Sequence, residues 1–281
     1  VAQRSARLNN ISNFEISENE TCRFFSLFSQ KDNRGSVVDI DPFGSPTKYF
    51  DCSIRATMHG GLLSVTATDM QVLHGLAKNA CKRKYYGVPI KTEYSNEIAI
   101  RLILGCLYAV SGRLGIQIIP QFVQTHMHYY RIFVKVLTKK DQNQNLGYIS
   151  HCFECGNRIV EKKSSNCCDK CNGELNSAGP LWIGQLFNKK FVNSMLNEIP
   201  KFIVDKKCVG ILEKSVSEAE MPATYYTLDK IASKIKGAPI KMKNAIKILQ
   251  DAGYLASPTS LNPTGFRTNC EIDEIIKLFK N

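Results

Sequence analysis

The stretch of sequence that decides the fold is Ser36-Val37-Val38-Asp39-Ile40-Asp41-Pro42-Phe43-Gly44-Ser45-Pro46. Its first half is an apolar run of strand length, and residues such as Pro42 and Gly44 end a run of this kind. The pattern predicts a buried strand over residues 36–40 that carries an acidic and an aromatic residue to its carboxyl end. In open α/β sheets, ligands bind at that edge, so we expect a site beside Asp41.

Helix and strand patterns alternate around this strand. We expect helices over residues 1–10, 21–28, 47–58 and 96–112, and strands over residues 13–16, 36–40, 61–67, 115–124 and 129–137. The last two strands are expected to pair as antiparallel neighbours. Strands that alternate with helices predict an α/β sheet of the doubly wound kind.

The second half of the chain has a different organisation. A polar run over residues 138–145 predicts a linker, and residues 187–216 predict one or two helices broken near Pro200. Residues 227–268 follow the order helix, turn, helix and β-hairpin, with Gly253 as the cap of the second helix. That order predicts a winged-helix-like domain, whose expected apolar core is Leu228, Ile231, Ile235, Ile246 and Leu249.

Composition and charge restrict the class of protein. The chain has 281 residues, of which 43% are hydrophobic, so we expect about two folded domains. Neither a bilayer-spanning segment nor a secretory signal is recognisable, which predicts a cytoplasmic protein without a membrane partner. The sequence leaves the oligomeric state open.

The net charge of +12 points to an acidic partner, with nucleic acid the first candidate. The excess is +7 over residues 1–150 and +5 over residues 151–281, which favours one large partner that touches both halves. A lysine-rich surface that serves only solubility is the alternative. The same two interpretations apply to a group of six lysines in the helical part of the winged-helix pattern, namely Lys230, Lys234, Lys236, Lys241, Lys243 and Lys247.

Four of the eleven cysteines have the spacing of a metal site. Cys152-x2-Cys155 and Cys168-x2-Cys171 are two knuckles that can direct four thiolates at one tetrahedral zinc ion. A redox disulfide role is the minor interpretation, and the neighbouring His151 is not needed as a ligand. We expect most of the other seven to be small buried hydrophobic residues; they are Cys22, Cys52, Cys81, Cys106, Cys167, Cys208 and Cys270.

The turn after the predicted strand suits one particular chemistry. The Asp41 carboxylate and the Pro42 carbonyl can accept the two hydrogens of an exocyclic amine, which directs the nitrogen lone pair at the methyl group of S-adenosylmethionine. Phe43 can stack on the flat base that carries the amine. Two other interpretations stay open from the residues alone: Asp39-x-Asp41 could bind magnesium, or Asp41 could simply cap a helix.

Several motifs follow one another through most of the chain. In order they are Asp39-Ile40-Asp41-Pro42-Phe43-Gly44-Ser45-Pro46, Thr66-Ala67-Thr68-Asp69, Arg83-Lys84-Tyr85, Glu93-x3-Glu97-x3-Arg101, His128-Tyr129-Tyr130-Arg131, Gly179-Pro180-Leu181-Trp182 and Ser260-x2-Asn262-Pro263-x-Gly265-x-Arg267-Thr268. Together they closely resemble the tRNA guanine-26 dimethyltransferase family, and the resemblance extends from about residue 4 to residue 268.

The resemblance implies a class I (Rossmann-like) methyltransferase domain that uses S-adenosylmethionine to methylate the N2 amine of guanine 26 in tRNA, usually twice. We assign residues 1–146 to this domain, residues 147–185 to the zinc-knuckle insert, and residues 186–281 to a family-specific α+β domain that binds tRNA.

The resemblance also implies roles for individual residues. Asp41, Pro42 and Phe43 are expected in the catalytic turn, Thr68 and Asp69 beside the same pocket, and Asp39, Asp41 and Glu20 around the cofactor. The cations expected to contact RNA phosphates are Arg83, Lys84 and Arg131, although Arg83 or Arg131 could instead pair with Glu93 or Glu97.

Three departures from the family pattern qualify these expectations. Position 96 is Asn where the family has His, and Glu20 stands where the family prefers Asp followed by Ala. The glycine-containing cofactor loop has no match, and the chain begins at Val1. We therefore expect a catalytic domain that is incomplete at its N-terminus and binds S-adenosylmethionine poorly. A non-catalytic zinc-containing RNA- or DNA-binding protein and an inactive methyltransferase homologue are the alternatives.

Overall fold

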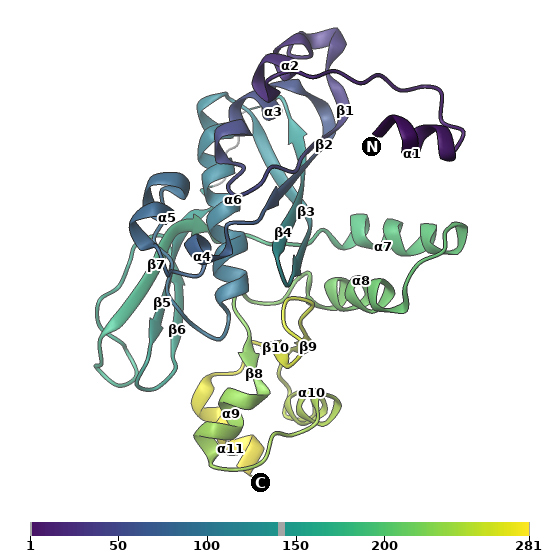
Figure 1. Ribbon diagram of the computed structural model, residues 1–281. Helices are drawn as coiled ribbons and strands as arrows, with labels where there is room; N and C mark the ends of the chain where they lie inside the picture. Colours follow the sequence, from purple (N-terminus) through teal and green to yellow (C-terminus); the bar gives the residue numbers. More distant parts are fainter. Residues whose placement is uncertain (1, 140–143, 281) are drawn as a thin grey trace.

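The computed structural model describes residues 2–139 and 144–280 (Figure 1). Its centre is a four-stranded sheet with the strand order β1-β2-β4-β3. The strands are β1 (Gly35–Ile40), β2 (Thr57–Ala67), β3 (Gln117–His126) and β4 (Tyr129–Leu137). β1 and β2 are parallel, whereas β4 is antiparallel to both β2 and β3, as predicted for the last two strands.

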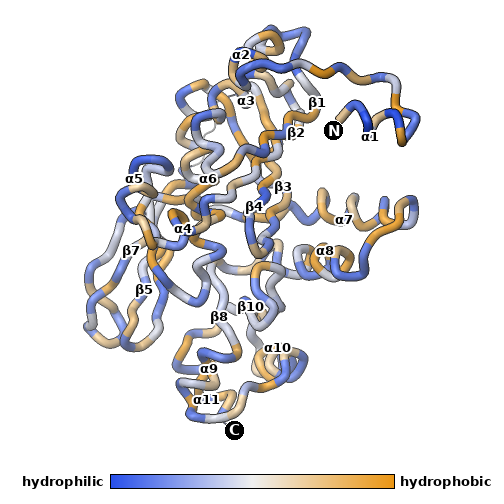
Figure 2. The backbone as a smooth tube through the Cα atoms, in the orientation of Figure 1, coloured by the Kyte–Doolittle hydropathy of each residue, from blue (hydrophilic) through white to orange (hydrophobic). Residues whose placement is uncertain are grey.

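Six helices accompany this sheet in the first half of the described chain. They are α1 (Ala2–Leu8), α2 (Thr21–Leu27), α3 (Phe50–Ala56), α4 (Met70–Leu73), α5 (Lys78–Tyr85) and α6 (Ser95–Arg113), with short 3-10 turns at Lys31–Asn33 and Thr47–Tyr49. Most of α6 is buried, and the helix runs along the sheet in Figure 1. In contrast, α5 is hydrophilic and shows as blue in Figure 2.

Two predicted elements of this half are wrong. Residues 13–16 form no strand, because their side chains are exposed and no neighbouring strand lies beside them in the described structure. The helix predicted over residues 47–58 ends at Ala56, and the buried Thr57 already belongs to β2. The backbone leaves the helix there because Thr57 takes an extended conformation and Gly60, with φ +81, cannot continue a helix.

A second sheet of three antiparallel strands carries the cysteine knuckles. Its order is β6-β5-β7, with β5 (Leu146–Cys152), β6 (Arg158–Glu161) and β7 (Leu175–Trp182). β7 packs closely on α6 at Gly105, where an added Cβ atom would lie 2.9 Å from the Cα atom of Leu181. This contact places the knuckle sheet directly against the central helix.

The C-terminal part has the predicted order of elements. α7 (Lys189–Glu198), a 3-10 turn (Ile199–Lys201) and α8 (Lys206–Glu218) form the broken helix pair. They are followed by β8 (Tyr226–Thr227), α9 (Leu228–Ile235), α10 (Met242–Asp251), β9 (Ala256–Pro258), β10 (Gly265–Thr268) and α11 (Ile272–Lys280). Gly253, with φ +87, follows the end of α10 as predicted. The winged-helix-like pattern is thus confirmed.

Two main apolar cores hold the molecule together, beside a small cluster at the cysteine knuckles. The smaller of the two lies inside the winged-helix-like part. Of the five predicted core residues, Leu228, Ile231 and Leu249 are buried in it, and the half-buried Ile235 and Ile246 pack against it. The larger one joins the central sheet to the knuckle sheet and to α7 and α8, through residues such as Ile149, Trp182 and Val192. The division at residues 146 and 185 stays a prediction, since the larger core spans both positions.

The remaining cysteines differ from the prediction. Cys22 and Cys52 form a disulfide between α2 and α3, which the separation of 30 residues did not reveal. Cys167 and Cys208 are exposed, whereas Cys81, Cys106 and Cys270 are buried as expected. Among the described residues, no helix is both long and apolar enough to cross a bilayer. The cytoplasmic location stays a prediction, and residues 140–143 of the predicted linker lie outside the described residues.

Candidate functional site: the turn after β1 and the cysteine knuckles

The turn that follows β1 presents its polar and aromatic groups to solvent. Asp41 is exposed, and the ring of Phe43 is fully exposed at 103% of its reference area. A cavity of about 470 Å³ opens beside them, lined also by Asp39 and by Thr21 and Tyr49 from the neighbouring helical segments. An exposed aromatic ring beside a free carboxylate can bind a flat base that carries a hydrogen-bond donor.

The end of β2 holds this turn in place. The Gly44 amide donates to the Thr68 hydroxyl oxygen at 2.6 Å, and the Thr68 amide donates to the Gly44 carbonyl at 3.0 Å. Gly44 has φ +82, a conformation that favours glycine. The two strand ends are therefore joined by a reciprocal pair of hydrogen bonds, which fixes the position of Asp41 and Phe43 relative to Thr68.

The predicted residue Asp69 is already engaged. Its carboxylate accepts a hydrogen bond from the Tyr85 hydroxyl at 2.6 Å and lies 3.2 Å from the Lys84 ammonium. Burial raises the pKa of Tyr85, and the nearby Asp69 charge raises it further, so the phenol stays protonated and donates. Asp69 thus links the end of β2 to α5, and Lys84 contributes its charge beside the site.

Of the other two predicted cations, Arg131 is in an ion pair, whereas Arg83 is in none among the described residues. Arg131 on β4 binds the Asp39 carboxylate at 2.8 Å. Arg83 on α5 is exposed. Neither of them pairs with Glu93 or Glu97, so that alternative is wrong. Tertiary packing instead brings Glu93 to Arg158 and Glu97 to Arg101 and Arg267.

Glu20 stands at the start of α2. Its carboxylate accepts the Arg23 amide at 2.9 Å and caps that helix, and this backbone hydrogen bond lowers the pKa of the Glu20 carboxyl. The adjacent Thr21 lines the cavity beside Asp41, together with Phe25. In the structure the Glu20 carboxylate caps α2, and its predicted cofactor role stays a prediction.

The residues present fit part of an S-adenosylmethionine site. Carboxylates of Asp39 and Asp41 and the apolar side chains of Phe25 and Tyr49 surround the cavity at the carboxyl end of β1. Such groups suit a positively charged sulfonium and a purine ring. The cofactor role of Asp39 and Asp41 stays a prediction.

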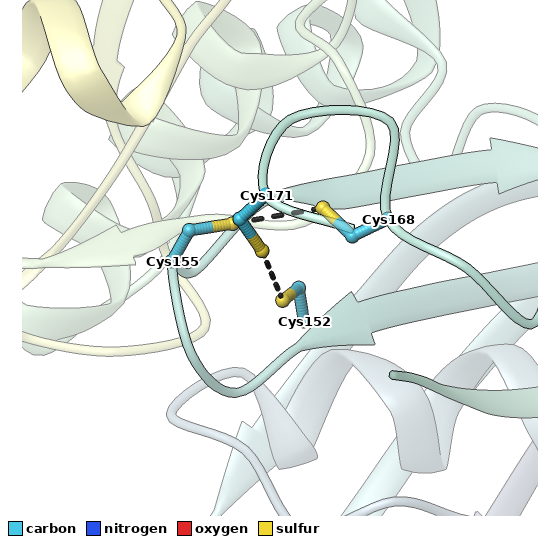
Figure 3. A group of neighbouring side chains, drawn as sticks. All are labelled: Cys152, Cys155, Cys168 and Cys171. Atoms are coloured by element: carbon cyan, nitrogen blue, oxygen red, sulfur yellow. Dashed lines mark hydrogen bonds between the residues drawn. The ribbon is translucent and has the colours of Figure 1, made fainter. Parts of the chain in front are cut away.

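The four predicted cysteine ligands meet at one point (Figure 3). The sulfur atoms of Cys152, Cys155, Cys168 and Cys171 all lie within 4.8 Å of one another, with 3.4 Å between Cys152 and Cys171. Four thiolates about 2.3 Å from a zinc ion would be separated by about 3.8 Å, so this donor set fits tetrahedral zinc. Cys168 and not Cys167 belongs to the cluster, as the spacing predicted.

The knuckles also contact the winged-helix-like part. The Lys234 ammonium donates to the Cys155 carbonyl at 3.1 Å, and Lys170 forms an ion pair with Glu271 at 2.9 Å. His151 is not part of the sulfur cluster, and its Nδ1 atom hydrogen-bonds the Tyr94 hydroxyl at 3.0 Å.

The structure contains a cluster of buried charged residues that was not predicted from the sequence. Glu97 on α6 is fully buried and accepts hydrogen bonds from Arg101 at 2.8 Å and from the Thr224 amide at 2.9 Å. Arg267 on β10 lies 3.0 Å from Glu97 and donates to Glu218 on α8 at 2.6 Å. The four-residue spacing of Glu97 and Arg101 within an apolar helix could have indicated a buried ion pair. No sequence pattern indicated that Glu218 would join it.

Asn96, the position that departs from the family pattern, is part of a polar chain. Its side-chain oxygen accepts the Tyr130 hydroxyl at 3.0 Å, and its amide donates to the Leu261 carbonyl at 3.1 Å. The Tyr130 hydroxyl also hydrogen-bonds His74, whose pKa is lowered by burial. The amide of Asn96 therefore joins β4 to the C-terminal part.

Comparisons with known proteins agree with this arrangement. Residues 1–280 match the family described as N2,N2-dimethylguanosine tRNA methyltransferase. A relative from Methanosphaera stadtmanae, named tRNA (guanine(26)-N(2))-dimethyltransferase, is 32% identical over 99% of this chain and 73% of its own length. The Aquifex aeolicus relative, named tRNA (guanine(26)-N(2)/guanine(27)-N(2))-dimethyltransferase, is 32% identical over 85% of this chain and 62% of its own length.

A solved structure has the same fold. The structure described as Trm1 from Pyrococcus horikoshii with S-adenosyl-L-methionine superposes with a TM-score of 0.81 at 25% identity, covering 98% of this chain and 77% of that one.

Proposed function

This chain belongs to the N2,N2-dimethylguanosine tRNA methyltransferase family, and we propose that it transfers methyl groups from S-adenosylmethionine to the N2 amine of guanine 26 in tRNA, giving N2,N2-dimethylguanine. The observation that carries this proposal is the turn after β1. It presents a free carboxylate and a fully exposed aromatic ring side by side, at the strand edge where α/β folds bind ligands.

Each residue of the turn has a separate role in the reaction. Phe43 stacks on the guanine after the base has left the helical stack. The Asp41 carboxylate and the Pro42 carbonyl accept the two N2 hydrogens and direct the nitrogen lone pair. S-adenosylmethionine, when bound, supplies a methyl group on a positively charged sulfur.

The proton leaves the nitrogen with or after methyl transfer, because an arylamine is too weak an acid to lose it first. The new N–C bond forms as the S–C bond breaks, and the nitrogen becomes positively charged. Its proton then passes to the Asp41 carboxylate or to water. Thr68 positions the turn through Gly44, and Asp69 holds Lys84 beside it.

tRNA is the acidic partner that the proposed function supplies, and the net charge of +12 favours such a partner. Arg83 and Lys84 on α5 are exposed cations beside the site, and we assign them to backbone phosphates. Arg131 contributes through Asp39, whose charge it partly neutralises at the edge of the cavity.

The test is transfer of tritium from labelled S-adenosylmethionine to two tRNA transcripts, with guanine or adenine at position 26, by the full-length gene product. We expect labelling of the guanine transcript only. Asp41→Ala should lower the rate by at least about 100-fold while tRNA binding changes little. Asp32→Ala is the matched control, because Asp32 is an exposed aspartate before the opposite end of the same strand.

Equal labelling of both transcripts would refute the assignment to position 26. Normal turnover by Asp41→Ala would refute the proposed mechanism.

A further inference from the structure

A cleft of about 390 Å³ lies between the cysteine knuckles and the winged-helix-like part, away from the turn after β1. The knuckle sheet provides one wall through Phe153 and Arg158. The first winged-helix-like helix, α9, provides the other through Lys230 and Lys234. Lys91, which follows α5 in the chain, also lines the cleft.

The cleft carries a strong positive charge. Lys91, Lys230, Lys234 and Arg158 line it, against the single carboxylate of Glu93. Arg158 forms an ion pair with Glu93, which accounts for one cation. In the described parts of the chain, the three lysines have no carboxylate within ion-pair distance. Lys230 and Lys91 are exposed, so their ammonium groups are accessible to a bound anion.

The cleft is also lined by an exposed aromatic side chain, Phe153. Phe153 lies between the ligands Cys152 and Cys155, and it keeps 54% of its surface exposed. The His151 ring contacts it edge-on, with 4.6 Å between the ring centroids. The knuckle therefore holds an exposed aromatic platform in a fixed orientation, which is the arrangement on which unpaired bases stack.

The cleft is also lined by a buried cation, Arg158. The Arg158 guanidinium lies between the rings of Tyr94 and Tyr226, 4.5 Å and 3.8 Å from their centroids. Its side chain is only 5% exposed. Within the described residues, its Nε atom has no hydrogen-bond partner, which leaves one buried donor available.

We propose that this cleft is a second tRNA-binding site, in which Lys91 and Lys230 contact backbone phosphates and Phe153 stacks on an unpaired base. This inference rests on the proposed function, because that function supplies the RNA. The course of the chain between the two sites supports this proposal. Lys84 and Tyr85 on α5 contact Asp69 beside the catalytic turn, and Lys91 in the cleft follows Tyr85 by six residues. A single RNA can thus contact both sites. A zinc ion bound by the knuckles would hold Phe153 in place in the cleft.

The test compares two double variants of the full-length gene product. Lys91→Glu with Lys230→Glu reverses two charges in the cleft. Lys162→Glu with Lys163→Glu reverses two exposed charges directly after β6, outside the cleft. Binding of unmodified tRNA is measured by fluorescence anisotropy at several salt concentrations.

We expect the cleft variant to bind tRNA on the order of 10-fold more weakly or worse at 0.1 M salt, and the slope of log Kd against log salt to fall by about 1.5 to 2. The control should keep the wild-type slope within about 0.5. Equal losses in both variants, or no loss in either, would overturn the proposal. The neutral pair Lys91→Ala and Lys230→Ala should show a smaller loss in the same direction.

Phe153 is tested separately, because stacking does not depend on salt in the same way. Phe153→Ala should weaken tRNA binding by roughly 5- to 100-fold, and Phe153→Tyr should restore it. The zinc content of each variant shows whether the knuckles are intact. If Phe153→Ala with full zinc binds like the wild type, the stacking part of the proposal is wrong.

The two proposals can fail separately. If the wild-type protein binds tRNA but leaves guanine 26 unmethylated, the proposed function fails and the binding comparison still decides the cleft. If methylation occurs normally and the cleft variants bind like the wild type, only the cleft proposal fails.

Discussion

Replacing Glu97 by Gln should destabilise the protein more than any single change at an exposed ion pair. Glu97 is fully buried and has two arginines around it, Arg101 and Arg267. Glutamine keeps the shape of the side chain but removes its charge. The cluster with Glu218 then contains two buried cations and one buried carboxylate.

The magnitude follows from two independent considerations. Burial by itself opposes ionisation of Glu97, but Arg267 and Arg101 outweigh it and lower the pKa of Glu97 from 4.5 to about 2. Such a decrease corresponds to about 3 kcal/mol of folding free energy at neutral pH. Removing one partner from a buried ion pair costs about 3–5 kcal/mol, which agrees. For a chain of this size we expect the melting temperature to fall by about 6–12 °C.

The pH dependence has a definite sign. Because the pKa of Glu97 is lower in the folded protein, its ionisation stabilises the fold above pH 4.5. That stabilisation is lost as the pH falls from 4.5 towards 2. The wild type and Glu97→Gln should therefore differ most near neutral pH, and their melting temperatures should converge in acid.

Thermal unfolding followed by circular dichroism at several pH values measures both effects. Asp51→Asn is the matched control, since Asp51 and Arg55 have the same four-residue spacing and the same 2.8 Å distance on α3 but are exposed. Exposed pairs contribute little, so this variant should melt close to the wild type. If the two variants lowered the melting temperature equally, or if the Glu97→Gln difference did not shrink in acid, the assigned role of the buried cluster would be wrong.

Two further predictions concern the site. Cys168→Ser should abolish the binding of about one zinc ion per chain measured by mass spectrometry, whereas Cys167→Ser should retain it, because only Cys168 lies in the sulfur cluster; retention of zinc by Cys168→Ser would contradict the ligand set. Thr68→Val removes the hydroxyl that accepts the Gly44 amide, so kcat should fall about 10-fold with little change in KM for tRNA, and Thr68→Ser should restore it. A kcat unchanged in Thr68→Val would show that this hydrogen bond does not position the turn.

Local sequence patterns predicted much of the fold. The run before Asp41 indicated β1, the apolar periodicity indicated α6, and the order of elements after residue 227 indicated the winged-helix-like part. The four cysteines of the sulfur cluster could also be identified, because each knuckle is a local unit of four residues. Where local signals competed, as at Thr57, the sequence assigned a helix to residues that belong to a strand.

The sequence by itself thus determined the strand with its Asp-Pro-Phe turn, the cysteine spacing and the excess positive charge, since each is a property of a short segment or of the composition. The tertiary structure alone decided the long-range pairings: Cys22 with Cys52, Arg131 with Asp39, and Arg267 with Glu97 and Glu218. It also decided that Lys91 and Lys230 face one cleft. Partners separated by tens of residues or more leave no periodic signal in the sequence, because their proximity is created only when sheets and helices pack.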